Sequence, residues 1–100
     1  MKEVSSKVNS IISRIGLYYA KEDSIKDKIF DMAEHLSVYR KLELHRECES
    51  VMDRMVELHD ELDEHRREWR NIAMDIGFLP REYRTMIFKI MVKKRMRPGI

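Results

Sequence analysis

Histidines spaced four positions from carboxylates are the residues of this chain whose types and spacing could support chemistry. On a helix this spacing places both side chains on one face, and the pairs are Asp31–His35, His45–Glu49, His59–Asp63 and Glu61–His65. Helical bundles that bind two metal ions use related spacings. The apolar pattern around them, however, directs His45 and His59 outward and leaves only His65 on the packed side. A helix rich in Asp and Glu produces such pairs by chance, so we expect no metal and no cofactor.

The short motifs that assemble a catalytic centre are missing from the sequence. It has no P-loop, nucleophile elbow, CxxC pair or glycine-rich phosphate loop. His59 and Asp60 are adjacent, as in metal-dependent phosphohydrolases, but the other ligand motifs of those enzymes are absent. The Ser, His and Asp residues fall on predicted helical faces with no scaffold to bring them together. The sequence therefore predicts a protein that is not an enzyme.

Basic residues gather in the last third of the chain. Residues 66–100 carry ten basic and three acidic side chains, whereas residues 41–65 carry three basic and nine acidic ones. Clustered cations bind phosphates in a salt-dependent manner that ignores base sequence. The candidate residues for a nucleic acid or another anionic partner are Arg81, Arg84, Lys89, Lys93, Lys94, Arg95 and Arg97, and Arg66, Arg67 and Arg70 extend the basic stretch toward the N-terminus.

Three other interpretations of this basic segment stay open. Its cations could form a solvated surface that neutralises the acidic middle of a neighbouring molecule. Alternatively, its apolar residues could dock on a protein target; these are Met86, Ile87, Phe88, Ile90 and Met91. The mixture of cations with Phe, Ile and Met is also typical of helices that lie on membrane surfaces, although we do not expect a membrane partner.

A long heptad pattern predicts the element that positions the basic segment. Seam residues recur at steps of four and three along residues 44–76, and no Gly or Pro interrupts them. Such a stripe indicates a helix that buries one side against another helix, here in a homo-oligomer. The predicted oligomerisation seam consists of Leu44, Cys48, Val51, Met55, Leu58, Leu62, His65, Trp69, Ile72 and Ile76.

Several seam residues carry alternatives of their own. His65 is either a register device or pH switch, or a packed ring that points one nitrogen at the rim. Cys48 is either a small buried hydrophobe or a crosslink between parallel copies. Trp69 is large for a two-stranded core, and Met52 and Val56 broaden the seam, which favours a bundle of more than two helices.

The helices on either side of the seam follow from the same periodicity. An apolar stripe predicts an N-terminal helix over 4–20, and residues 21–24 are interpreted as a connection with Asp23 or Ser24 as helix cap. A second stripe then starts out of phase with the seam. The phase shift indicates either a stutter within one helix over 24–76 or a tight turn near 37–43 that makes a helical hairpin. The lack of Gly, Pro, Asn and Asp in that stretch favours the continuous helix.

The positions of glycine and proline, together with the composition, complete the predicted architecture. Gly77 is predicted to be the left-handed C-cap of the long helix, and Pro80 is predicted to begin a basic helix over 80–96. With 100 residues, 38% of them charged, and only three Gly and two Pro, we expect a single helical domain over 1–100. The lone Cys48 excludes an intramolecular disulfide. No signal-peptide core opens the chain and no apolar run approaches the ~20 residues of a membrane span, so we expect a soluble, cytoplasmic protein.

The end of the long helix carries a resemblance to a known family. Ile76-Gly77-Phe78-Leu79-Pro80, followed by Arg81 and Arg84, resembles the C-terminal part of some phage terminase small subunits. The run there is typically Leu-Gly-Leu-Thr-Pro before Ser- and Arg-rich residues, and Leu79 stands here in place of Thr. The resemblance covers residues 69–86. It implies a non-catalytic, ring-forming protein, phage-encoded in a bacterial host, that recognises viral DNA and hands it to an ATP-driven large subunit.

These observations predict an all-α fold. A long heptad-patterned helix, as a coiled coil or helical hairpin, is accompanied by a short N-terminal helix and a basic C-terminal helix. The expected function is that of a non-catalytic oligomeric assembly protein that binds an anionic partner, with DNA packaging in phages as the named example. The alternative is a coiled-coil adaptor or regulator that docks a target protein through its C-terminal helix.

Overall fold

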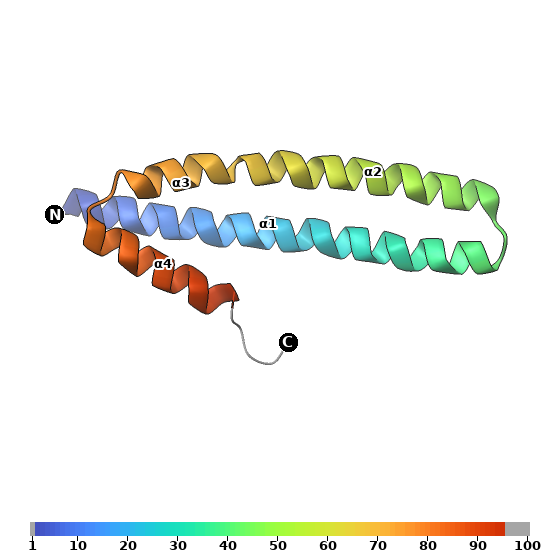
Figure 1. Cartoon of the computed structure of the whole chain (residues 1–100), viewed down its shortest axis with the longest axis horizontal. Coiled ribbons are helices and arrows are strands. Elements are labelled where there is room, and N and C mark those ends of the chain that lie inside the picture. The colour runs from blue at the N-terminus through green and yellow to red at the C-terminus, as the bar shows by residue number, and fades with distance from the viewer. Residues whose placement is uncertain (1, 96–100) are drawn as a thin grey trace. The chain divides into compact units, whose positions relative to one another are not determined.

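The computed structural model describes residues 2–95 of the chain, with the side chains of residues 5–93. Four helices follow one another: α1 (Lys2–Lys41), α2 (His45–Arg67), α3 (Trp69–Gly77) and α4 (Arg81–Arg95) (Figure 1). No strand occurs within the part of the chain that the structure describes. The prediction of an all-α fold is confirmed.

The helices form two compact units. Unit 1 comprises Met1–Leu17 and Trp69–Ile100, and unit 2 comprises Tyr18–Glu68. α1 contributes its first residues to unit 1 and its remainder to unit 2, α2 lies in unit 2, and α3 and α4 lie in unit 1.

α1 is much longer than the predicted N-terminal helix over 4–20. The expected connection at residues 21–24 is helical, so that prediction is wrong. Its apolar stripe continues in register from Tyr18 to Ile25 because Glu22 fills the seam position between them, where it is buried. Asp23 and Ser24, the expected cap residues, are exposed on the outer side of the helix. There they cost only a few tenths of a kcal/mol in helix propensity.

A tight turn separates α1 from α2, so the prediction of one continuous helix over 24–76 is also wrong and the hairpin alternative is correct. The Leu44 amide donates to the Tyr39 carbonyl at 2.9 Å, and the Glu43 amide donates to the Arg40 carbonyl at 3.1 Å. These two bonds define a Schellman motif, whose penultimate residue adopts a left-handed backbone. That residue is Glu43, with φ of 56°.

The turn forms despite this conformation because the hairpin buries apolar side chains. A non-glycine residue in the left-handed region costs about 1–2 kcal/mol. Leu58 and Leu62 are both buried in the hairpin, and each fully buried leucine contributes about 1.5–3 kcal/mol. Packing of α2 on α1 therefore outweighs the strain of the turn, and the phase shift in the sequence marks the boundary between two helices.

Unit 2 is a helical hairpin in which the second part of α1 runs antiparallel to α2 (Figure 1). Its buried residues are Tyr18, Glu22 and Ile25 from α1, and Val51, Leu58, Leu62 and His65 from α2. Packing is thinner toward the turn, where the stripe residues are only half-buried: Ile29, Met32, Leu36, Tyr39, Cys48 and Met55. Two helices alone cannot enclose their shared stripe there.

Unit 1 has its own apolar core. The buried residues come from α1, α3, the connection between α3 and α4, and α4: Val8, Ile11, Ile15, Ile72, Ile76, Leu79 and Ile87. Arg14 of α1 also forms an ion pair with Asp75 of α3. α4 starts one residue after Pro80, close to the predicted start of the basic helix, and the predicted end at position 96 lies outside the described residues.

The end of α3 corrects the prediction of a left-handed cap at Gly77. Gly77 is the last residue of α3, and its φ lies outside the left-handed region. The Phe78 amide donates to the carbonyls of Met74 and Asp75, and the Leu79 amide donates to Ile76 at 3.0 Å. These bonds tighten the last turn toward 3₁₀ geometry, which satisfies the final carbonyls without a positive φ.

The left-handed residue of the turn provides a stability test. Replacing Glu43 with Gly removes the steric cost of its Cβ, and part of that gain is offset by the greater freedom of glycine in the unfolded chain. We expect Glu43→Gly to raise the free energy of unfolding by about 0.5–1 kcal/mol in urea titrations. Glu43→Ala, which removes the carboxylate but keeps the Cβ, is the control and should change stability by less than about 0.5 kcal/mol. Equal gains from both variants would contradict the role of backbone strain.

Candidate functional site

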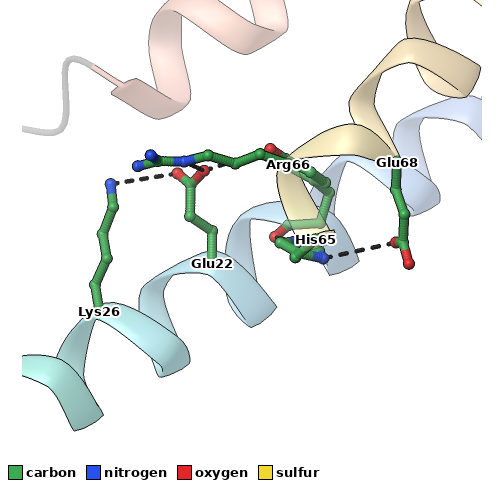
Figure 2. Close-up of polar contacts among 6 residues, drawn as sticks. Glu22, Lys26, His65, Arg66 and Glu68 are labelled. Carbon is green, nitrogen blue, oxygen red and sulfur yellow. Dashed lines mark hydrogen bonds and ion pairs between the residues drawn. The ribbon is translucent and has the colours of Figure 1, made fainter. Parts of the chain in front are cut away.

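A polar cluster interrupts the apolar stripe of unit 2 (Figure 2). Glu22 occupies a seam position of α1 and is buried. Lys26 donates to its Oε1 at 3.4 Å, and the Arg66 Nε donates to its Oε2 at 3.5 Å. The Tyr18 hydroxyl donates to the same Oε2 at 3.4 Å. Three donors from two helices thus surround one carboxylate.

His65 lies beside this cluster and is also buried. Its ring stacks on that of Tyr18, with centroids 4.3 Å apart and planes inclined by 20°. Its Nε2 lies 2.8 Å from the backbone carbonyl oxygen of Tyr18. Because a carbonyl only accepts, Nε2 carries a proton and donates it. Its Nδ1 faces Glu68, whose Oε2 is 3.6 Å away (Figure 2).

Two pKa values in the cluster are displaced in ways that reflect this packing. Burial is the largest effect on Glu22 and by itself would raise its pKa, but Lys26 and Arg66 together outweigh it and lower the pKa of the carboxyl. Burial, followed by the charge of Glu22, raises the pKa of the Tyr18 hydroxyl. Glu22 is therefore ionised and Tyr18 neutral at pH 7, so the cluster is a charged contact between packed helices.

The cluster has the features of a packing device. The Glu22 carboxylate is occupied by donors from Tyr18, Lys26 and Arg66. The structure shows His65 as a buried ring that joins α2 to the α1 backbone. Arg66, which the sequence grouped with the basic stretch, is engaged in unit 2 instead.

Three of the four histidine–carboxylate pairs of the sequence lie apart from this cluster, and in the fourth pair His65 is buried whereas Glu61 is exposed. His45, Glu49, His59 and Asp63 are all exposed on α2, as are Asp31 and His35 on α1. Within the described residues, no three His, Cys, Asp or Glu side chains converge as metal ligands would.

The basic residues predicted to bind an anionic partner lie in unit 1 on α4. Arg81, Arg84, Lys89 and Lys93 are exposed. Phe88 and Val92, each 55% exposed, fall between them on the same side of the helix. Lys94 and Arg95 belong to α4, although their side chains are not described, and Arg97 lies outside the described residues. We call Arg81, Arg84, Phe88, Lys89, Val92 and Lys93 the α4 face.

The cations of the α4 face are available to a partner. Among the described residues, no carboxylate lies within 4.0 Å of their charged groups, because every ion pair found there involves other residues. The opposite side of α4 is anchored by Ile87, which is fully buried. Unit 1 carries eleven basic and three acidic side chains, whereas unit 2 carries nine basic and fifteen acidic ones. The α4 face therefore belongs to the cationic unit of the protein.

The apolar residues predicted to dock on a protein target are divided by the packing of unit 1. Ile87 belongs to the core, and Ile90 and Met91 are half-buried. Met86 and Phe88 remain exposed, and Val92, which the sequence interpretation left out, joins them.

All residues of the predicted oligomerisation seam except Leu44 pack within the chain. Nine of the ten are buried or half-buried in unit 2 or unit 1. The buried members are Val51, Leu58, Leu62, His65, Ile72 and Ile76. Cys48, Met55 and Trp69 are half-buried, and Leu44 is exposed. Any surface for self-association must therefore include residues outside the seam.

Comparisons with protein-family models, curated proteins and solved structures gave no match to this chain. Within the described residues, no helix combines the length and apolar character needed to cross a membrane. The helices define an all-α protein, and its two candidate functional features are the polar cluster and the α4 face.

The lowered pKa of Glu22 makes a signed prediction about acid stability. The folded chain binds the Glu22 proton more weakly than the unfolded chain, so this carboxylate stabilises the fold above its ordinary pKa of 4.5 and ceases to do so as the pH falls through its folded value. We expect Glu22→Gln to lower the free energy of unfolding by about 1 kcal/mol at pH 7. The difference from the parent chain should shrink as the pH falls from 6 toward 3.

Chemical denaturation at several pH values measures this difference. Glu64→Gln, at an exposed position of α2, is the matched control and should follow the parent chain at every pH. A difference for Glu22→Gln that does not change with pH would contradict the contribution of its ionised form.

Proposed function

We propose that the protein is a non-catalytic helical assembly protein that self-associates and binds nucleic acid through the α4 face. Phage DNA packaging, in the role of a terminase small subunit, is the specific setting that the sequence resemblance suggests. The observation that carries the proposal is the exposure of Arg81, Arg84, Lys89 and Lys93 without carboxylate partners among the described residues.

The chemistry of such a face favours a polyanion. Each cation that meets a phosphate releases a condensed counterion, so the affinity falls with salt by a slope of about −0.9 per phosphate contact on duplex DNA. Four contacts predict a slope of about −3.6. Burial of Ile87 on the other side holds the helix against unit 1, so the four cations are presented by an ordered helix. Because contacts between such cations and phosphates do not depend on the bases, we propose binding that is independent of base sequence.

Charge reversal on the α4 face tests nucleic-acid binding. The full chain carrying Arg84→Glu and Lys89→Glu should bind a fluorescent DNA duplex of about 20 base pairs roughly tenfold more weakly at low salt, with a salt slope reduced by about two. Fluorescence anisotropy between about 50 and 200 mM salt measures both quantities.

The control makes the same change in net charge elsewhere. Lys21→Glu and Lys28→Glu alter two exposed cations of α1 in unit 2 and should leave the salt slope unchanged. Equal losses from the two double variants, or no binding by the parent chain, would overturn the nucleic-acid proposal.

A second candidate is a protein-docking role for the same helix. It is favoured by Phe88 and Val92, which expose more than half of their surface among the cations. An apolar target site would hold the chain at high salt, because burial of aromatic surface is not screened. We expect Phe88→Asp to abolish capture of such a target at about 0.5 M salt, while Arg84→Glu with Lys89→Glu would not. Pull-down measurements with the full chain distinguish this outcome from binding that salt removes.

A further inference from the structure

The outer side of α2 carries a second stripe of residues that the hairpin does not cover. Its members recur at steps of four and three, as those of the packed seam do, and so line one face of the helix. Met52 and Val56 at its centre are 49% and 60% exposed. We call this set the outer stripe: His45, Glu49, Met52, Val56, His59 and Asp63, all exposed.

Two copies of the outer stripe that run in opposite directions present complementary residue types to each other. From one end it runs imidazole, carboxylate, apolar, apolar, imidazole, carboxylate. A second copy of α2 can lie antiparallel about a twofold axis at the level of Arg54, midway along the helix between Met52 and Val56. His45 then falls opposite Asp63 of the second copy. In the same register Glu49 falls opposite His59, and Met52 falls opposite Val56. Every imidazole then meets a carboxylate, and the apolar residues meet each other.

Carboxylates outnumber cations on the remaining exposed surface of α2. Outside the outer stripe, α2 exposes four arginines, of which Arg54 is paired with Glu57. Its six exposed carboxylates there are Glu47, Asp53, Glu57, Asp60, Glu61 and Glu64. Like charges brought together across an interface oppose association. The outer stripe holds two carboxylates and two imidazoles, so it is the part of α2 on which an identical chain can pack. Asp53 lies at the edge of the stripe near the axis, where it would approach Asp53 of the second copy and repel it.

The incomplete packing of unit 2 leaves apolar surface on α2 that a second copy could cover. Near the turn the hairpin leaves Cys48 and Met55 of the seam only half-buried, and Met52 and Val56 adjoin them on the helix surface. A second hairpin laid along α2 would bring four helices together, and α2 would gain a second neighbouring helix. The contact would be isologous, since the same residues serve on both copies.

We propose that the outer stripe is a self-association surface on which a second copy of this chain packs antiparallel about a twofold axis at Arg54. The proposal rests on the self-association part of the proposed function and names its surface. It does not involve the α4 face, so it can fail while nucleic-acid binding stands.

The mass of the full chain in solution, measured by sedimentation equilibrium between about 1 and 200 µM, tests the proposal. The parent chain is expected to be a dimer. Val56→Asp places a carboxylate opposite Met52 in both halves of the interface and should raise the dissociation constant by tenfold or more, roughly what a buried unpaired charge causes. Val38→Asp makes the same substitution at a valine of α1 that is 52% exposed, and it should leave the dimer intact.

A charge exchange tests the antiparallel register. His59→Glu sets two carboxylates against each other, Glu49 and the new one, and should weaken the dimer. Adding Glu49→Lys to that variant restores opposite charges across the axis and should restore dimerisation. Both positions are exposed, and circular dichroism verifies that the helices persist in each variant.

Each outcome decides the proposal. A monomeric parent chain at the highest concentration overturns it, as does an oligomer that Val56→Asp and Val38→Asp affect equally. A dimer that His59→Glu weakens and the double exchange does not restore overturns the antiparallel register. Salt-sensitive DNA binding by a monomeric chain would overturn the outer stripe alone and leave the α4 face in place.

Discussion

The register between α1 and α2 depends on the contact between Tyr18 and His65. Apolar residues repeat every seven positions along both helices, so sliding one helix by a heptad would still bring leucine and isoleucine together. The buried polar residues remove this ambiguity. His65 donates to one particular carbonyl, that of Tyr18, and Glu22 meets Arg66 only in the same alignment. In any other register a carboxylate and an imidazole would be buried without partners, which is far more costly than an imperfect apolar contact.

Periodicity predicts which residues are buried, but it does not reveal where the chain reverses. The seam of α2 and α3 could be predicted from the sequence because nine of its ten members are buried or half-buried. The turn could not, since neither of its ends carries the usual signal: Glu43 takes the left-handed position that commonly belongs to glycine, and Leu44 caps α2 without a side-chain hydrogen bond. Conversely, Gly77 is a helix-ending residue that needs no glycine conformation. Glu22 was hidden for a related reason, because a charged residue at a seam position resembles a break in the stripe, although the seven-residue step from Tyr18 to Ile25 spans it.

The α4 face was easier to find because exposed charge is visible in composition. The sequence could not show which apolar residues of α4 are buried and which are exposed. Ile87 and Phe88 are neighbours of similar hydrophobicity, yet one is fully buried and the other is more than half exposed. On an isolated helix with apolar residues around most of its circumference, periodicity leaves several orientations open. The packing of unit 1 selects the one in which Ile87 is covered, and this choice leaves Phe88 and Val92 among the cations.

Closure of the hairpin also changes how copies of the chain can meet. A long heptad seam left open would accept another chain in several registers and both directions. The hairpin covers that seam, and on the proposed outer stripe the order of charged and apolar residues would match a second copy in the antiparallel direction. Such a dimer would carry two α4 faces, whatever the orientation of unit 1. A polyanion long enough to reach both would then be held at two points, and its apparent affinity would exceed that of one face because the second contact is intramolecular.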